Sequence, residues 1–485
     1  MRIALVHYHL QHGGVTRIIC HLQNALGKRG VATVVLTGKP PEFDFPGAFR
    51  VIPGLQYEAT RPAISPSELA AQMSAAAVEA LAGPPDLWHV HNHSLGKSLV
   101  LPAALLELAR QGEHFLFQIH DFAEDGRPGN YRAMLAQMAD GRSEILSGFL
   151  YPQAGHLHYA VLSGRDCRYL QDAGLDRHQL HLLPNPVDLG QVAEQEPTAA
   201  PIGAPLWLYP TRGIRRKNLG EFLLWSALAS AGTQFAITSG PENPAERHRY
   251  ARWKEVAAEL GLPVTFEAAE QPGCSFIDLL RRADGAVTTS VAEGFGMAFL
   301  EPWTLGTPVC GRNLPEITAG FRREGIVLPW SYDRLEIPLA WLGHERVEAA
   351  AGEGLKRNLA AYGRFPAKGA LERLLAAWIR NGRVDFGRLD EPLQEMVLRR
   401  LAASPGQGES IAPSALPDPA GLTAVMANNR ALLRSRHNLA QYGAVVEHIY
   451  QQVAASPVTS IDSLNGSVLL DRFLAPERLS LLRVD

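Results

Sequence analysis

Two acids eight residues apart, Glu293 and Glu301, enclose a glycine turn in the stretch VAEGFGMAFLEPW (291–303). A strand predicted over 286–290 ends before this turn, and a helix is predicted to begin near Gly296. A helix amino end leaves N–H groups unpaired and partly positive, and glycines let an anion approach the backbone. The turn therefore predicts main-chain binding of a diphosphate. The residues concerned are Gly294, Phe295, Gly296 and Met297.

The two carboxylates suit a different part of the same ligand. Carboxylates accept hydrogen bonds from hydroxyls. Glu293 before the turn and Glu301 beyond it therefore predict a hydroxyl-bearing group on each side of the diphosphate, as in a nucleotide-sugar. The simpler alternative is an acidic first helical turn that the helix dipole alone favours.

A second stretch, LYPTRGIRRKNLGEF, follows the strand predicted over 206–210. Four of six residues in it are basic, and cations at a strand end hold a diphosphate and stabilise it as it leaves. The alternative is a solvated basic turn, but two such motifs at equivalent strand ends of one domain support each other. The four basic residues are Arg212, Arg215, Arg216 and Lys217.

The strands and helices that would position these motifs alternate along the chain. RIALVHY (2–8) and VATVVLTG (31–38) have the pattern of buried strands, and the intervening TRIICHLQNALGKRG has that of an amphipathic helix. A proline- and alanine-rich segment interrupts the alternation, which then resumes. This pattern predicts an α/β protein with two doubly wound Rossmann-like domains. Their bounds are 1–188 and 205–430, with a linker over 189–204.

The last third of the chain is less informative. Residues 331–430 have mostly helical patterns, few strand patterns and no chemical motif. A long helix is predicted over 427–456, and the leucine-rich tail that follows is predicted to pack. Oligomeric state stays open.

Composition excludes several classes of protein. The 485 residues are 46% hydrophobic and 20% charged, with a net charge of −3, which gives no electrostatic argument for nucleic acid. The four cysteines form no CxxC pair, which favours reduced thiols and a cytoplasmic protein. No apolar run reaches the ~18 residues of a spanning helix. Peripheral membrane contact stays possible.

The triplet HVHNH raises the question of a metal. His89, His91 and His93 are two residues apart, so on a strand they share one face, and zinc accepts such ligands. No acid or cysteine nearby completes the set, so histidines of the core or of a strand end are the favoured interpretation. His91 also remains a candidate acceptor contact.

The loop DFAEDGRPGNYR (121–132) is polar and follows His120 at a strand end. It is predicted either to shape an acceptor pocket or to be a solvated loop. The candidate acceptor residues are Asp121, Glu124, Asp125, Arg127 and Tyr131.

Several motifs together resemble retaining GT-B glycosyltransferases of glycosyltransferase family 4. EGFGMAFLE resembles the family's E-x7-E signature, RGIRRKN its G-R-x4-K-G element, and HGGVTR its amino-terminal glycine pair. PDLWHVHNH, QIHDF, VLSGRD and LLPNPVD follow in the family's order, and the resemblance covers most of 1–320. Thr211 and Asn218 stand where the family's glycines flank the basic element, and Pro302 lacks an N–H at the helix start.

The resemblance implies the GT-B fold, with two Rossmann-like domains facing an interdomain cleft, the first on the acceptor side and the second on the donor side. It also implies that the final helix and tail, 431–485, cross back to the first domain. Glu293 would hold the donor sugar's hydroxyls and Glu301 the ribose. Arg212 and Lys217 would bind the diphosphate.

In the first domain the resemblance implies roles for three residues. His120 would lie beside the donor sugar, and the backbone at Gly13 and Gly14 would approach the phosphates and the reacting sugar. The family needs no metal and no cofactor.

The expected reaction is transfer of a hexose from a UDP-, GDP- or ADP-sugar to an acceptor hydroxyl, with retention of anomeric configuration. The acceptor would be a sugar, a small molecule or a lipid-linked molecule. Alternatives are a GT-B epimerase or phosphorylase, or a non-catalytic nucleotide-sugar-binding protein.

Overall fold

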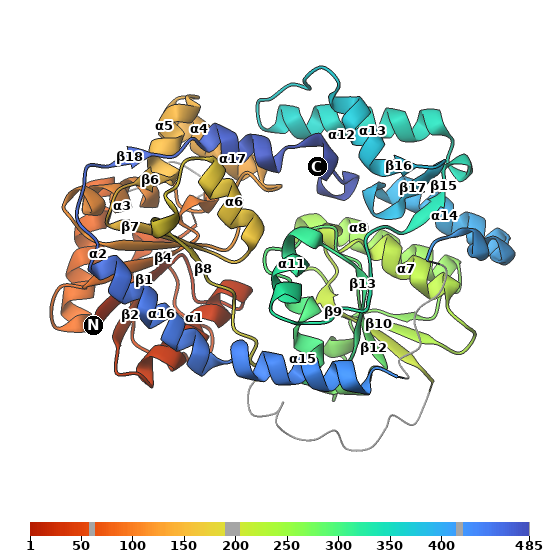
Figure 1. Ribbon diagram of the computed structural model, residues 1–485, viewed down its shortest axis with the longest axis horizontal. Coiled ribbons are helices and arrows are strands. Elements are labelled where there is room, and N and C mark those ends of the chain that lie inside the picture. Colours follow the sequence, from red (N-terminus) through yellow and green to blue (C-terminus); the bar gives the residue numbers. More distant parts are fainter. Residues whose placement is uncertain (58–63, 190–203, 414–420, 485) are drawn as a thin grey trace. The chain divides into compact units, whose positions relative to one another are not determined.

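The computed structural model describes residues 1–57, 64–189, 204–413 and 421–484 (Figure 1). Contacts between Cα atoms divide the chain into two compact units. Unit 1 comprises Met1–Pro186 and Arg436–Leu474, and unit 2 comprises Val187–Ser435 and Ala475–Asp485. The segment predicted as a linker, 189–204, lies almost wholly outside the described residues.

Unit 1 is built on a parallel sheet of seven strands in the order β3-β2-β1-β4-β5-β7-β8. Strands β1, β4, β5 and β7 are buried almost throughout, which explains their continuous apolar runs. The strands are β1 (Arg2–His7), β2 (Ala32–Thr37), β3 (Phe49–Val51), β4 (Leu87–His91), β5 (Phe115–Ile119), β7 (Leu157–Val161) and β8 (Leu180–Leu182). A short antiparallel pair joins β6 (Pro152–Gln153) to β18 (Asp462–Ser463).

Eight helices of unit 1 accompany this sheet among the described residues: α1 (Gly14–Gly27), α2 (Pro66–Leu81), α3 (Leu101–Arg110), α4 (Pro128–Ala139), α5 (Ser143–Leu150), α6 (Gly164–Asp172), α16 (Leu439–Ala454) and α17 (Gly466–Phe473). Ser163 caps α6 by accepting a hydrogen bond from the Asp166 N–H. The late helix α16 packs beside α1 and places Tyr442, Val446 and Tyr450 in the core of unit 1.

The single helix predicted over 427–456 is wrong, because this segment holds two helices, α15 (Thr423–Arg436) and α16. Asn438 accepts a hydrogen bond from the Gln441 N–H at 2.8 Å and so starts α16 anew. The predicted tail also divides between the units: contacts assign 436–474 to unit 1 and the last residues, from Ala475 on, to unit 2.

Unit 2 contains a parallel sheet of six strands in the order β11-β10-β9-β12-β13-β14. These are β9 (Leu206–Arg212), β10 (Gln234–Ser239), β11 (Val264–Thr265), β12 (Gly285–Thr288), β13 (Val309–Arg312) and β14 (Trp330–Tyr332). The helices of this part are α7 (Leu219–Leu228), α8 (Pro244–Glu259), α9 (Phe276–Arg282), α10 (Glu301–Thr304) and α11 (Pro315–Arg323).

A small antiparallel sheet, β15-β17-β16, follows β14 and was not predicted. Its strands have two or three residues each, too few to show an alternating pattern. They are β15 (Glu336–Pro338), β16 (Ile379–Arg380) and β17 (Arg383–Asp385). The predicted helical character is otherwise present in α12 (His344–Ala361), α13 (Ala370–Trp378), α14 (Glu391–Ala403) and α15. Within the described ranges, no helix has both the length and the apolarity needed to cross a membrane.

Candidate functional site

In unit 2 the loops that follow β9 and β12 are joined by hydrogen bonds. The Val291 N–H donates to the Arg216 carbonyl at 3.0 Å, and the Thr289 hydroxyl donates to the carbonyls of Lys217 and Asn218 at 2.9 and 3.0 Å. The Tyr209 hydroxyl, on β9, donates to the Lys217 carbonyl at 2.9 Å. Adjacent parallel strands thus carry both predicted motifs to one edge of the sheet, and these bonds fix the backbone on either side of Lys217.

The side chains of Lys217 and Glu293 meet at this edge. Lys217 Nζ lies 2.5 Å from Glu293 Oε1, and Arg216 Nη1 lies 3.1 Å from Glu293 Oε2. Only 9% of the Glu293 side chain and 11% of the Lys217 side chain are exposed. Burial by itself raises the pKa of Glu293, but the cations of Lys217 and Arg216 outweigh it and lower that pKa to about 2. Burial also lowers the pKa of Lys217, an effect that Glu293 opposes, so the Glu293 carboxylate is ionised at neutral pH and lies against two basic side chains.

The glycine turn beyond Glu293 differs from its prediction. Gly296 has φ 92°, a left-handed conformation that suits glycine, and it precedes a three-residue 3₁₀ turn over Met297–Phe299. The α-helix begins only at Glu301 and has four residues, with Pro302 in its first turn. The prediction of one helix beginning near Gly296 is therefore wrong. So short a helix has little dipole, so the predicted diphosphate binding would depend on the loop amides and the neighbouring cations.

The remaining residues of this turn are anchored differently from one another. Phe295 is buried and its ring meets that of Phe321 edge-on, with centroids 5.4 Å apart. Gly294 and Met297 are partly exposed. Glu301 is 9% exposed, and its carbonyl accepts a hydrogen bond from the Thr304 hydroxyl at 2.7 Å. The turn thus holds its aromatic inward while part of its backbone stays accessible.

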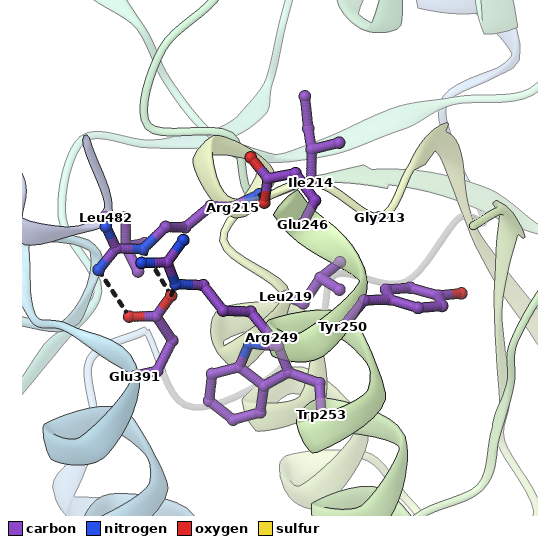
Figure 2. A pocket seen from close by; sticks show the side chains of 10 residues that line it. All are labelled: Gly213, Ile214, Arg215, Leu219, Glu246, Arg249, Tyr250, Trp253, Glu391 and Leu482. Atoms are coloured by element: carbon purple, nitrogen blue, oxygen red, sulfur yellow. Dashed lines mark hydrogen bonds and ion pairs between the residues drawn. The ribbon is translucent and has the colours of Figure 1, made fainter. Parts of the chain in front are cut away.

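The four basic residues of the other motif divide into separate pairs. Arg212 is about half exposed, and its guanidinium lies 3.1 Å from Glu242 rather than beside Glu293. Arg215 binds both oxygens of Glu391, at 2.6 and 2.9 Å, in a small pocket that Figure 2 shows with Leu482 on one side. The free volume of that pocket, about 10 Å³, is room for one water molecule.

Sequence reasoning gave Arg216 no separate role, although its guanidinium contacts Glu293 directly. The run of four basic residues in six marks this region, but the spacing alone does not show which arginine contacts Glu293 together with Lys217. The diphosphate role predicted for Arg212 stays a prediction.

In unit 1 the glycine pair lies at the start of α1, just beyond β1. Gly13 is the residue before the helix and has an extended backbone that any residue adopts, with φ 170°. A Cβ built on Gly14 would meet nothing within 4 Å, and one on Gly13 only a carbonyl at 4.0 Å. Neither glycine is thus required by the conformation or packing of the described protein. Their approach to the phosphates and the reacting sugar, which the family resemblance implies, stays a prediction.

His120 directly follows β5 and is buried. Its Nε2 lies 2.9 Å from His91 Nδ1, and its N–H donates to the Asn92 side-chain oxygen at 2.7 Å. Burial lowers the pKa of His120 to about 4, so the ring is neutral at physiological pH. It is therefore suited to a hydrogen bond with a hydroxyl and not to pairing with an anion. Its predicted place beside a donor sugar stays a prediction.

The expectation that the three histidines of HVHNH share one face is wrong for His93. His89 and His91 stack on β4 with ring centroids 4.3 Å apart. Asn92 then adopts a left-handed conformation with φ 57°, which turns the chain, and His93 Nε2 instead lies 2.8 Å from the Leu150 carbonyl. No group of three or more potential ligands suited to a metal occurs within 1–57, 64–189, 204–413 and 421–484.

The candidates of the 121–132 loop separate into exposed and buried residues. Asp121 and Arg127 pair at 3.2 Å and are both partly exposed, so they remain available for an acceptor. Glu124 is buried, accepts a hydrogen bond from Tyr151, and has its pKa raised to about 7 by burial. Asp125, which lies 3.6 Å from Arg165, and the buried Tyr131 also face the interior of unit 1.

Sequence comparison supports the resemblance over the first part of the chain. Residues 12–191 match the family model described as Glycosyltransferase Family 4. Mannosylglucosyl-3-phosphoglycerate synthase of Petrotoga mobilis is 26% identical over 237 residues, 44% of this chain and 44% of that protein. The match therefore spans less than half of this curated relative.

Solved structures match over most of the chain. They include sucrose-phosphate synthase of Thermosynechococcus elongatus (TM-score 0.52, 17% identity, 93% of this chain and 99% of that chain). A glycosyltransferase of Rickettsia africae has TM-score 0.54 at 11% identity, with 93% and 98% covered. HepE of Anabaena, in complex with UDP and glucose, has TM-score 0.50 at 15% identity, with 93% and 99% covered. The chain resembles family 4 glycosyltransferases and has the α/β GT-B fold, so both predictions are confirmed.

Proposed function

We propose that the chain is a retaining hexosyltransferase that moves a sugar from a nucleoside-diphosphate sugar to an acceptor hydroxyl. The observation that carries this proposal is the buried pair of Lys217 and Glu293, with Arg216 beside it, at the ends of β9 and β12. The cation that we assign to the diphosphate and the carboxylate that we assign to the sugar hydroxyls are thus one hydrogen bond apart, which supports the proposal.

In the proposed reaction the bond between the anomeric carbon and the diphosphate oxygen breaks. The acceptor oxygen bonds to the same face of that carbon, and the departing phosphate takes the acceptor proton. Lys217 and Arg216 stabilise the charge that develops on the leaving diphosphate. Glu293 holds the donor sugar's hydroxyls and Glu301 the ribose, while the loop amides over Gly294–Met297 receive the phosphates. These protein cations take the role that a metal has in other phosphate sites, so we propose no metal or cofactor.

UDP-sugars are the first donors to test, since HepE of Anabaena is described in complex with UDP-glucose. GDP- and ADP-sugars are the comparison set. For the acceptor we propose a sugar, small-molecule or lipid-linked hydroxyl compound that contacts unit 1, where Asp121 and Arg127 stay exposed beyond β5.

The decisive experiment is product analysis by mass spectrometry and NMR after incubation with each nucleotide-sugar and a panel of hydroxyl acceptors. A new glycosidic product with the donor's anomeric configuration supports the proposal, and EDTA should leave its rate unchanged. An inverted product would refute retention. Free-sugar epimerisation, phosphorolysis, or binding without turnover would each support an alternative function instead.

We further propose a cytoplasmic protein that contacts membranes only at its periphery. The segment between α12 and α13 supports the membrane contact, because Phe365 is 87% exposed there and the basic residues Arg364 and Lys368 lie near it in the sequence. An exposed aromatic ring beside cations is typical of a weak, salt-sensitive contact with anionic lipid. Sedimentation with vesicles containing phosphatidylglycerol tests it: Phe365→Asp should reduce binding at low salt, and equal binding to neutral vesicles would refute the electrostatic part.

A further inference from the structure

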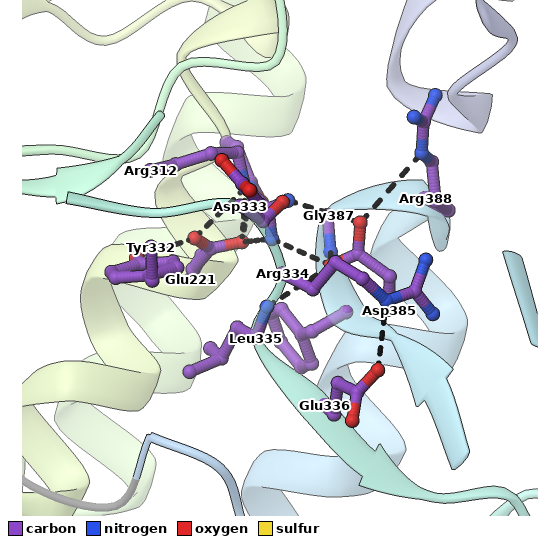
Figure 3. A network of polar contacts seen from close by, with 12 residues as sticks. Glu221, Arg312, Tyr332, Asp333, Arg334, Leu335, Glu336, Asp385, Gly387 and Arg388 are labelled. Carbon is purple, nitrogen blue, oxygen red and sulfur yellow. Dashed lines mark hydrogen bonds and ion pairs between the residues drawn. The ribbon is translucent and has the colours of Figure 1, made fainter. Parts of the chain in front are cut away.

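A network of buried charges lies in unit 2 behind the loop that carries Lys217. The Arg312 guanidinium donates to the carboxylate of Glu221, with Nη2 at 2.6 Å, and to both oxygens of Asp385, at 3.0 and 2.8 Å (Figure 3). The Tyr332 hydroxyl donates to Glu221 at 2.7 Å. All three charged side chains are at most 5% exposed.

The small sheet β15-β17-β16, which follows β14, supplies one side of this network. Asp385 ends β17 and also accepts hydrogen bonds from the backbone N–H groups of Leu335 and Gly387. A Cβ on Gly387 would lie 2.4 Å from Arg312 Cζ, so the guanidinium packs directly against this backbone. The small sheet β15-β17-β16 thus has a specific contact with the main sheet through β13.

Asn218 connects the network to the loop of Lys217. Its side-chain amide donates to Glu221 at 2.7 Å, and its side-chain oxygen accepts from Gln394 of α14 at 2.8 Å. Asn218 itself has φ 55°, a left-handed conformation that few residues other than glycine and asparagine adopt readily. Both the backbone and the side chain of Asn218 are therefore fixed where the chain turns from Lys217 into α7.

Stability alone is a poor explanation for this arrangement. Removing one cation and two carboxylates from water is costly, and apolar residues of similar size often stabilise a core equally well. A fully hydrogen-bonded ionic network does, however, fix the directions of the groups that belong to it. The side chain whose direction matters here is that of Lys217, the residue before Asn218, because its Nζ contacts Glu293.

We propose that the Glu221–Arg312–Asp385 network, acting through Asn218 and Gln394, is a positioning device for Lys217, and that this is a role of the small sheet β15-β17-β16. Asn218, Gln394 and Arg312 are positioning residues that contact no substrate. The inference rests on the proposed function, since its consequence is the placement of a cation for the donor diphosphate. A lysine held in advance binds a diphosphate without first being ordered, so disturbing the network should weaken nucleotide binding at unchanged charge.

The test uses Asn218→Gly and Gln394→Met in the full chain. Asn218→Gly keeps a residue suited to φ 55° but removes both side-chain bonds, and Gln394→Met keeps the volume but removes the donor to Asn218. Calorimetric titration with UDP, GDP and ADP should show about fivefold weaker binding for each variant. The double variant should be scarcely weaker than either single one, because both remove the same link.

The matched control is Asn429→Ala. Asn429 is a fully buried asparagine of unit 2 whose side chain bonds both backbone groups of Val327. Its loss should lower Tm like the test variants but leave nucleotide affinity within twofold of the wild type. Hydrogen exchange without nucleotide should quicken in 213–223 for the two test variants only.

Two results would overturn the inference. One is nucleotide affinity and loop exchange of both test variants within twofold of the wild type, while Lys217→Ala loses binding. The other is an equal loss of affinity in Asn429→Ala, which would show a general effect of destabilisation. If the wild-type protein binds none of the three nucleotides, the proposed function is refuted and the effect on binding cannot follow. In that case, unchanged hydrogen exchange in 213–223 of the two test variants would refute the positioning role itself.

Discussion

Titratable groups are buried in different ways at the carboxyl ends of β1, β4 and β5 in unit 1 and of β9 and β12 in unit 2. Unit 1 gathers histidines, among them His7, His91 and His120, whose pKa values burial lowers so that the rings are neutral. Unit 2 buries full charges, with Glu293 facing Lys217 and Arg216. A neutral polar surface suits hydroxyls, and a charged one suits a diphosphate. Burial alone therefore does not set the protonation state of a group, because it keeps histidines neutral but leaves a carboxylate that is paired with cations ionised.

The largest effect is expected from Lys217→Ala. This change removes the cation nearest to Glu293 and leaves a buried carboxylate beside a half-exposed arginine. We expect kcat/KM for sugar transfer to fall about 100-fold or more, the range seen when one electrostatic contact to the transition state is lost. Steady-state kinetics with the nucleotide-sugar that is active in the product analysis measures this fall.

Lys254→Ala is the matched control for Lys217→Ala. Lys254 also pairs with a glutamate, Glu267, at 2.9 Å, but both are partly exposed. Its loss should leave kcat/KM within twofold. Comparable activity of the two variants would show that the buried pair of unit 2 has no part in catalysis.

The next largest effect is a difference between the two units in how their stability changes at acidic pH. The pKa values of His7 and His89 are lowered by burial to about 3, and those of His93 and His120 to about 4, from 6.5. Below pH 6.5 the unfolded chain therefore binds more protons than the folded one, and stability falls as pH decreases toward 4. Each such histidine removes about 1 kcal/mol at pH 5.5. The buried Glu124, with a raised pKa, offsets about one of them.

Glu293 in unit 2 responds at lower pH. Its pKa is lowered, to about 2, so its contribution is complete above 4.5 and is lost only as pH falls from 4.5 toward 2. Hydrogen exchange at pH 7.5 and 5.5, corrected for the intrinsic rate, should show protection lost first in the sheet of unit 1. Equal losses in both sheets, or an earlier loss in unit 2, would contradict this. His89→Gln should reduce the pH dependence of unit 1.

A smaller effect on stability is expected from Gly387→Ala. The added methyl would overlap the Arg312 guanidinium at 2.4 Å and force the buried network of unit 2 apart. We expect a loss of about 1–3 kcal/mol in the free energy of unfolding, measured by denaturant titration. Gly352→Ala is the control, because its methyl would make an ordinary 3.7 Å contact in the middle of α12. It should be neutral or stabilising. A loss as large in the control would show that the effect does not come from the Arg312 network.

Sequence patterns predict the main sheets because each buried strand carries its own signal, and they predict Glu293 and Lys217 because a motif surrounds each. They do not predict the Arg312 network. Glu221, Arg312 and Asp385 lie 73 or more residues apart in pairs that no local pattern links. Asn218 is only partly predictable from the sequence. The sequence shows asparagine where the family has glycine, and the left-handed φ of 55° explains why either residue suits this position.

The smallest effect is expected from two arginines of the same motif in unit 2, Arg212 and Arg216. Arg212 is paired with the exposed Glu242, so Arg212→Ala should change the free energy of unfolding by no more than about 0.5 kcal/mol. Arg216→Ala removes a contact to Glu293 and one to the Ala292 carbonyl. If the bound diphosphate meets the cations as they lie in the described structure, Arg216→Ala weakens nucleotide binding more than Arg212→Ala, by calorimetric titration. The opposite order would show that Arg212 leaves Glu242 for the ligand, as its predicted role requires.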